Sequence, residues 1–173
     1  QLLSFTEMKQ PAHLARSPFG QIPTWQDGGR ILFESGAILM YLADKTGSSL
    51  LPADPAARAT VTQWLMWQMG GLGPMVGQAH HFLFNPKEVV PYGQKRYHDE
   101  AKRLYGVMDR QLAKNAYLAG ADYSIADIAS YPWISRYERH QVDLNDFPNV
   151  KRWYEQISAR PAVQRGMAVP FQN

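Results

Sequence analysis

Hydrophobic residues recur at helical spacing along most of the chain after residue 54. A first predicted helix carries four residues on one face: Val61, Trp64, Leu65 and Gln68. The glycine-rich run Gly70–Pro74 should kink or end this helix. A second predicted helix starts near Pro91, and one stripe along it collects Tyr97, Ala101, Leu104, Met108 and Leu112.

Two further helices are predicted near the end of the chain. The third should begin after Ser124, a favourable N-cap residue, because Asp127 three positions later completes a variant of the capping box. The fourth should stop before Pro161, and one of its faces is apolar: Val150, Trp153 and Ile157.

The hydrophobic pattern before residue 47 is different, since short β-prone runs take the place of the long apolar stripes of the predicted helices. Two of them, IPTW and RILF, flank the turn sequence QDGG and predict a β-hairpin. The rest of residues 1–33 reads as short β-type and loop pieces. A helix should follow Glu34 and Ser35 and stop at Gly47.

The composition of Gly47–Pro55 is that of a linker, and Asp54 followed by Pro55 is typical of a helix start. The expected organisation is a small α/β piece at residues 1–46, a linker at 47–54 and an all-α domain at 55–173.

Composition narrows the function classes. Of the 173 residues, 45% are hydrophobic and 19% charged, which is typical of a globular protein. The absence of cysteine excludes disulfide scaffolds, thiolate zinc sites and cysteine nucleophiles, and it fits a reducing compartment. The net charge of +3 is scattered, so we expect no nucleic-acid partner.

No apolar run approaches the ~20 residues of a membrane span. His80 and His81 lack the further ligands of a metal site.

Two short stretches could bind a ligand. An X-Pro bond before a strand, Ile22-Pro23, is either a plain turn or a cis site that leaves the Ile22 backbone free to pair with an extended ligand. Ser35 is either an ordinary N-cap beside a solvated Glu34, or the two form a ligand site. In the second case the helix start binds a carboxylate and Glu34 binds an ammonium, as an α-amino acid requires.

Arg96 lies on the polar side of its predicted helix. It is either a solvated charge, paired at most with Glu100, or an anion contact across a dimer interface.

These segments together resemble a known family. SPFGQIPTW, LFESGAILMYLADKTG and YSIADIASYPW, in this order, are similar to the cytosolic glutathione transferases. QWLMWQMGGLGPMVGQAHHF and VPYGQKRYHDEAKRLYGVMDRQL resemble more narrowly the bacterial Nu class, which is related to the yeast prion-forming nitrogen regulator. The resemblance covers nearly the whole chain.

The resemblance implies an α+β thioredoxin-like N-terminal domain, here incomplete, followed by an all-α C-terminal domain in a cytoplasmic homodimer. It implies that Pro23 is cis and that Ile22 pairs with the cysteinyl part of glutathione, the co-substrate. Glu34 and Ser35 would hold the γ-glutamyl end, and Arg96 would reach glutathione from the neighbouring subunit. Met8 stands where the class has a glutamine, for which Lys9 or Gln10 would substitute.

The implied reaction is attack by the glutathione thiolate on an electrophile, a disulfide or a peroxide. The implied role of this reaction is detoxification. In the family a strand and a helix precede what is Gln1 here, and they carry the residue that activates the sulfur, so no catalytic residue is named. Two alternatives stay open. One is a non-catalytic glutathione-binding or regulatory protein, and the other a truncated chain with an exposed sheet edge. The second substrate is not predicted.

Overall fold

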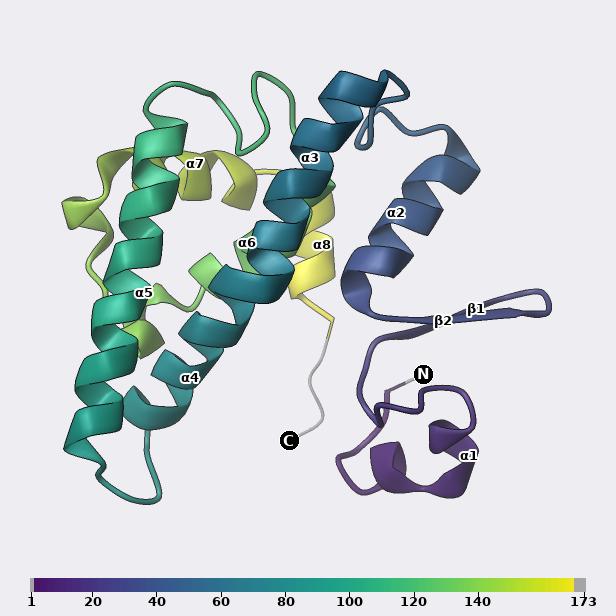
Figure 1. The fold of residues 1–173 in the computed structure, drawn as a ribbon, viewed down its shortest axis with the longest axis horizontal. Coiled ribbons are helices and arrows are strands. Elements are labelled where there is room, and N and C mark those ends of the chain that lie inside the picture. Colours follow the sequence, from purple (N-terminus) through teal and green to yellow (C-terminus); the bar gives the residue numbers. More distant parts are fainter. Residues whose placement is uncertain (1, 170–173) are drawn as a thin grey trace.

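The computed structural model describes residues 2–169 (Figure 1). Residue 1 and residues 170–173, which the expected domain limits include, lie outside the described residues. The chain begins with a 3₁₀ turn (Glu7–Lys9), helix α1 (Pro11–Leu14), strands β1 (Thr24–Asp27) and β2 (Arg30–Phe33) and helix α2 (Ser35–Thr46). The remaining elements are α3 (Pro55–Trp67), a π-helical turn (Gln68–Leu72), α4 (Gly73–Leu83), α5 (Pro91–Leu112), α6 (Ile125–Ile134), two 3₁₀ turns (Tyr137–His140, Leu144–Asp146), α7 (Pro148–Ser158) and α8 (Pro161–Met167).

The predicted hairpin is confirmed. β1 and β2 pair antiparallel with Trp25 opposite Leu32, and Gly28 in the connecting turn has a φ of 57°, which glycine adopts readily. β1 starts at Thr24, two residues later than predicted, because Pro23 has no N–H for a ladder. The prediction of only β-type and loop pieces before the hairpin is wrong, since the segment contains a 3₁₀ turn and α1.

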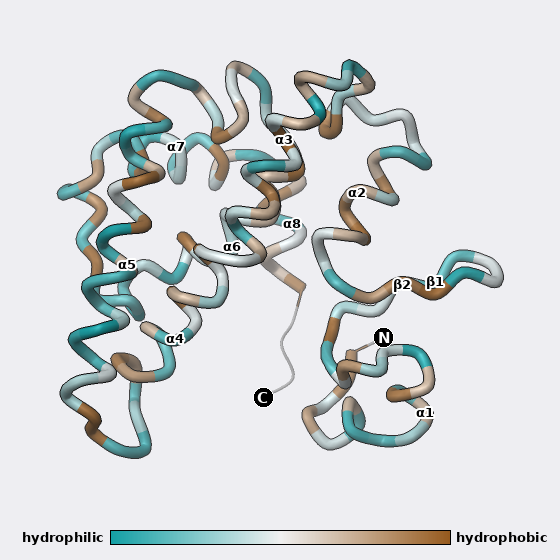
Figure 2. The backbone as a smooth tube through the Cα atoms, in the orientation of Figure 1, coloured by the Kyte–Doolittle hydropathy of each residue, from teal (hydrophilic) through white to brown (hydrophobic). Residues whose placement is uncertain are grey.

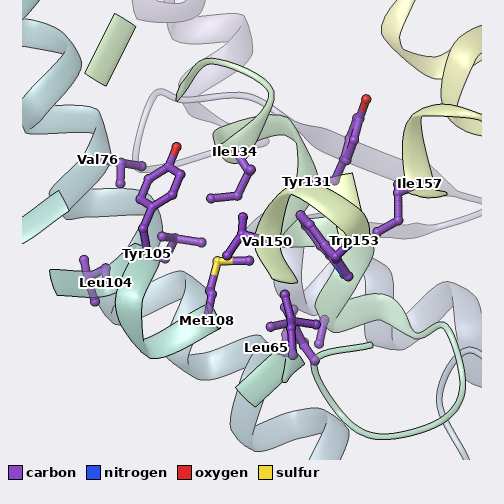
Figure 3. Packing of buried hydrophobic residues seen from close by; sticks show 14 of the residues in the cluster. Leu65, Val76, Leu104, Tyr105, Met108, Tyr131, Ile134, Val150, Trp153 and Ile157 are labelled. Carbon is purple, nitrogen blue, oxygen red and sulfur yellow. The ribbon is translucent and has the colours of Figure 1, made fainter. Parts of the chain in front are cut away.

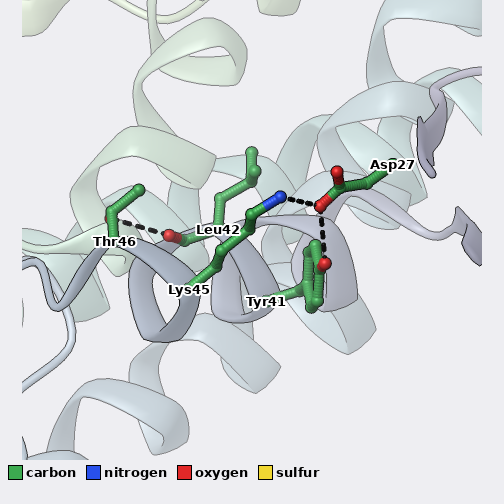
Figure 4. A network of polar contacts seen from close by, with 5 residues as sticks. All are labelled: Asp27, Tyr41, Leu42, Lys45 and Thr46. Atoms are coloured by element: carbon green, nitrogen blue, oxygen red, sulfur yellow. Dashed lines mark hydrogen bonds and ion pairs between the residues drawn. The ribbon is translucent and has the colours of Figure 1, made fainter.

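Helix α2 ends as predicted, with Gly47 in the left-handed conformation (φ 60°). It also holds the far end of the hairpin, where the Tyr41 hydroxyl donates to the Asp27 carboxylate over 2.6 Å and the Lys45 ammonium pairs with the same oxygen (Figure 4). The hydrogen bond from Lys45, and then that from Tyr41, lowers the pKa of Asp27. The hairpin is thereby fixed to the helix that follows it.

The core lies in the helical part, among α3, α4, α5, α6 and α7 (Figure 3). Side chains predicted to share stripes, such as Leu65, Met108 and Trp153, are fully buried there. Each fully buried side chain of this size contributes roughly 1.5–3 kcal/mol through the area it removes from water. The core therefore depends on packing between elements that are distant in sequence.

The glycine-rich run interrupts the α-helical path, as predicted, since α3 ends at Trp67. Gln68–Leu72 forms a π-helical turn that leads directly into α4. This turn directs Met69 against the start of α2, where a Cβ on Gly36 would lie 3.2 Å from the Met69 methyl carbon. Met69 thus packs the helical part against the N-terminal part.

The N-terminal part has little apolar cover of its own. Figure 2 shows hydrophobic colouring on β2, and the side chains of Trp25, Ile31 and Phe33 are all exposed. Within residues 2–169 none of the helices combines the length and the apolar character needed to cross a membrane.

Candidate functional site

A cavity of about 230 Å³ lies between the loop before β1 and the start of α2. It is lined by Ser17, Phe19, Gln21, Ile22, Pro23, Phe33, Glu34 and Ser35. Four of the five residues proposed from the sequence therefore meet in one place, although the eleven residues 23–33, which contain the hairpin, separate Ile22 from Glu34.

The Ile22 backbone is free at this cavity. The Ile22-Pro23 peptide bond is cis, as the resemblance implied. Within residues 2–169, no partner is hydrogen-bonded to the Ile22 N–H or to its C=O. The side chain is 56% exposed, so the residue lies at the surface of the loop. Both backbone groups can pair with an extended ligand in the manner of an added strand.

Glu34 lies immediately before α2 in an unusual backbone conformation, with φ 71° and ψ 114°. A residue other than glycine at positive φ is strained by roughly 1–3 kcal/mol, and such residues cluster at ligand sites. The Glu34 side chain does not cap the helix, and it forms no hydrogen bond within the described residues. Its carboxylate is exposed and available to an ammonium group.

The interpretation of Ser35 as an ordinary N-cap is wrong, because Ser35 is the first residue of α2. Its hydroxyl instead faces the Met69 sulfur at 3.9 Å, a weak contact. The backbone N–H groups of Ser35, Gly36 and Ala37 donate to no acceptor in the part of the chain that the structure describes. A helix end with three free donors beside a free carboxylate matches the two charges of an α-amino acid.

Sequence reasoning missed four lining residues: Ser17, Phe19, Gln21 and Phe33. Their proximity to Ile22-Pro23 and to Glu34 in the sequence was the available signal. Met8, which replaces the glutamine of the class, does not line this cavity, and neither do its expected substitutes Lys9 and Gln10. Met8 is buried, and the Lys9 ammonium donates to the Gly20 carbonyl over 2.8 Å.

The fold does not bring Arg96 to this cavity within one chain. Figure 1 shows α5, which carries it, on the opposite side of the molecule from the hairpin. Arg96 lines a second cavity, of about 590 Å³, formed by Met75 and residues of α5. Glu100, named as at most a partner of a solvated Arg96, instead accepts two hydrogen bonds from Arg103, at 2.7 and 2.8 Å. Arg96 is exposed, with its guanidinium 5.9 Å from the Tyr97 ring.

Two histidines of the helical part, His80 and His140, are packing residues in this structure. His80 lies edge-on to Phe84, and His140 is buried with its Nδ1 3.0 Å from the Tyr105 hydroxyl. Among residues 2–169 no group of three or more histidine or acidic side chains is placed to hold a metal ion.

Comparisons with known proteins agree with this geometry. The glutathione S-transferase N-terminal domain matches residues 3–44, and the glutathione S-transferase C-terminal domain matches residues 73–161. The disulfide-bond oxidoreductase YfcG of Escherichia coli K12 is 46% identical over 165 residues, which are 91% of this chain and 76% of YfcG.

Two solved structures are similar over nearly the whole chain. A glutathione transferase from Burkholderia graminis, with two glutathione molecules bound per subunit, has a TM-score of 0.89 and 39% identity over 100% of this chain and 78% of that one. A glutathione transferase from Pseudomonas putida, with one glutathione disulfide bound per subunit, has a TM-score of 0.89 and 42% identity over 97% of this chain and 79% of that one.

These matches confirm the expected fold class, a thioredoxin-like α+β N-terminal domain followed by a helical C-terminal domain. Together with the two family models, they show that the chain belongs to the glutathione S-transferase family.

Proposed function

We propose that this chain is a glutathione-dependent disulfide-bond reductase or peroxidase with some transferase activity. The observation that carries the proposal is the meeting of the free Ile22 backbone, the Glu34 carboxylate and the open start of α2 in one cavity. The name of YfcG and the glutathione disulfide in the Pseudomonas putida structure support a disulfide as substrate.

The residues present suit glutathione. The Ile22 N–H and C=O pair with the cysteinyl backbone, as an added strand would. Glu34 accepts from the γ-glutamyl ammonium, and the free N–H groups at the start of α2 donate to the neighbouring carboxylate. The Ser35 hydroxyl, whose contact with sulfur is weak, can turn to the same carboxylate.

Glutathione supplies the thiol, so the reaction needs no cysteine from the protein, and this chain has none. Two glutathione thiols are oxidised to glutathione disulfide while one substrate disulfide is reduced to two thiols. The described residues bind and orient the co-substrate through Ile22, Pro23, Glu34 and Ser35. We assign no catalytic residue.

We further propose a homodimer in which Arg96 completes the site of the neighbouring subunit. Arg96 is exposed, is not hydrogen-bonded to Glu100, and lines the cavity formed by Met75 and residues of α5. A planar guanidinium in such a place can bind a carboxylate of glutathione bidentately. We also propose that residues 47–54 are the linker between the N-terminal and the C-terminal domain. The proposed role of the enzyme is detoxification in the cytoplasm.

The test is the reduction of bis(2-hydroxyethyl) disulfide at varied glutathione concentration, with glutathione binding measured by calorimetry. Glu34→Gln and Arg96→Ala should each raise the half-saturating glutathione concentration about tenfold or more, since each removes a charged hydrogen bond. Glu88→Gln, the same chemical change at an exposed loop position, is the matched control.

The possible outcomes separate the two functional alternatives. If both variants bind glutathione as the wild type does, the site assignment is wrong. If the wild type binds glutathione but reduces neither the disulfide nor a hydroperoxide, the non-catalytic alternative holds.

A further inference from the structure

Three side chains of the preceding segment form hydrogen bonds to the loop that carries Ile22. The Lys9 ammonium donates to the Gly20 carbonyl over 2.8 Å. His13 Nε2 and the Ser17 hydroxyl both contact the next carbonyl, that of Gln21, at 2.9 and 3.1 Å. Because a carbonyl oxygen only accepts, Nε2 carries the hydrogen and donates it.

The two groups on the Gln21 carbonyl are interior groups. His13 is 3% exposed and Ser17 is 1% exposed, although neither belongs to the main hydrophobic core. A histidine and a serine at this depth need partners, and both side chains share the backbone carbonyl of Gln21 as their acceptor. The short α1, which contains His13, thus serves to direct this ring at the loop.

The neighbouring Gly20 allows this close approach. Its φ is 63°, and a Cβ there would lie 3.0 Å from a Leu14 methyl carbon and 3.2 Å from the Lys9 ammonium nitrogen. A side chain at this position would displace the residues that hold the loop.

Fixing the Gln21 carbonyl also fixes the Ile22 N–H. The two groups belong to one planar peptide unit, and in a trans unit the C=O and the N–H point in opposite directions. Only the next peptide bond, Ile22-Pro23, is cis among those the structure describes. Since His13 and Ser17 hold the carbonyl on the inner side, the Ile22 N–H is turned outward, where no acceptor within residues 2–169 meets it.

We propose that His13 and Ser17 are positioning residues of the glutathione site, acting through the Gln21–Ile22 peptide plane. The inference rests on the function proposed for the same cavity. Without the two donors, the loop samples other orientations of this plane, and the ligand has to order it on binding. Glutathione affinity falls, while the chemistry on bound glutathione changes little.

The experiment measures glutathione binding by calorimetry, and KM and kcat for the reduction of bis(2-hydroxyethyl) disulfide, on the whole chain. His13→Leu removes the donor, and His13→Gln restores one through its amide nitrogen. Ser17→Ala removes the second donor with a minimal change of volume. His98→Leu is the matched control, because His98 Nε2 lies 3.1 Å from the Gln141 carbonyl in the helical part.

We expect His13→Leu and Ser17→Ala to raise Kd and the glutathione KM about five- to tenfold, with kcat within about twofold of wild type. The double variant should lose less than the product of the two losses, because both side chains hold one carbonyl. His13→Gln should recover most of the affinity, and His98→Leu should leave Kd unchanged.

Wild-type affinity in folded His13→Leu, or an equal loss in His13→Gln, would overturn the inference. Should His13→Leu fail to melt cooperatively, Ser17→Ala decides alone, by its Kd and by whether glutathione still shifts the Ile22 amide resonance. If Glu34→Gln weakens binding but Ser17→Ala and His13→Leu do not, the positioning role fails and the proposed function stands. If the wild type does not bind glutathione, both fail.

Discussion

Glu34 combines a strained backbone with a free carboxylate, two properties that can be separated by substitution. Glycine adopts the Glu34 φ of 71° without a Cβ penalty, so Glu34→Gly relieves strain while it removes the charge. We expect an unchanged or slightly higher melting temperature together with at least about a tenfold loss of glutathione affinity. Thermal melts and calorimetry on the same samples check both. A lower melting temperature with retained affinity would show that Glu34 is structural.

His140 gives stability a pH dependence at the scale of one residue. Burial, and then the nearby charges of His80, Arg136 and Arg139, lower the pKa of His140 to about 4. Its ordinary pKa in an unfolded chain is about 6.5. Between these values the unfolded chain binds more protons than the folded one, so the free energy of unfolding falls as the pH falls from 6.5 to 4.

The predicted loss from this residue is roughly 3 kcal/mol, at about 1.4 kcal/mol per pKa unit. Urea unfolding at pH 7.5 and 4.5 gives the change in the free energy of unfolding between these pH values. The contribution of His140 is the difference between this change in the wild type and in His140→Phe. The variant should lose less stability on acidification, even though its Tyr105 hydroxyl lacks a partner. His98→Phe, at a more exposed position, should keep the wild-type pH dependence. Equal slopes in wild type and His140→Phe would contradict the assignment.

At the scale of elements, Asp127 joins the start of α6 to two distant parts of the fold. One of its carboxylate oxygens accepts from the Leu118 N–H at 3.0 Å and from Trp153 Nε1 at 2.8 Å. The other accepts from the N–H and the hydroxyl of Ser124, both at 3.0 Å. Burial raises the pKa of this carboxyl, and the four hydrogen bonds oppose the rise.

Asp127→Ala should therefore lower the free energy of unfolding by about 3 kcal/mol or more, because four buried donors lose their acceptor. Denaturant unfolding checks this value. Asp146→Ala, an acidic residue that is exposed and has no side-chain hydrogen bond among the described residues, should change it by less than about 0.5 kcal/mol. A similar effect of the two substitutions would show that the network around Asp127 contributes little.

At the scale of the whole molecule, the proposed site is shared between two chains. In a two-fold symmetric dimer, each site then takes Glu34 from one subunit and Arg96 from the other. Equal amounts of Glu34→Gln and Arg96→Ala chains, unfolded and refolded together, should regain about one quarter of wild-type sites. Half of the dimers are mixed, and in each mixed dimer one site carries both substitutions while the other carries neither. One of the two sites in half of the dimers is therefore intact. The readout is glutathione-dependent reduction of a disulfide. No recovery, in dimers shown to be mixed by mass, would place Arg96 outside the site.

The predictions that succeeded depend on neighbours in sequence. The hairpin follows from QDGG between two β-prone runs, and the end of α2 follows from Gly47. Ser124 and Asp127 form the predicted capping box within a single turn. Each of these signals needs only residues within a few positions, because hydrogen bonds and φ preferences at turns and caps are local.

The predictions that failed needed distant partners. Ser35 reads locally as a cap, but its hydroxyl faces Met69, 34 residues away. The GGLGP run is predicted to kink or end the helix, and α3 does end at Trp67, but only the tertiary structure shows the π-helical turn that leads on into α4. A pairing of Arg96 with Glu100, one of the alternatives for Arg96, fails for a local reason instead, because Arg103 binds both carboxylate oxygens of Glu100.

The sequence by itself determined the helices α2, α3, α5, α6 and α7, the hairpin and, through its resemblance to a family, four residues of the candidate site. Hydrophobic periodicity and cap residues predict these elements because both depend only on residues a few positions apart in the sequence. Only the tertiary structure decided how the site is held: the Gln21 carbonyl on His13 and Ser17, Met69 against Gly36, and Glu34 at positive φ. These contacts join segments through packing and hydrogen bonds across space, and such distances exist only once the chain has folded.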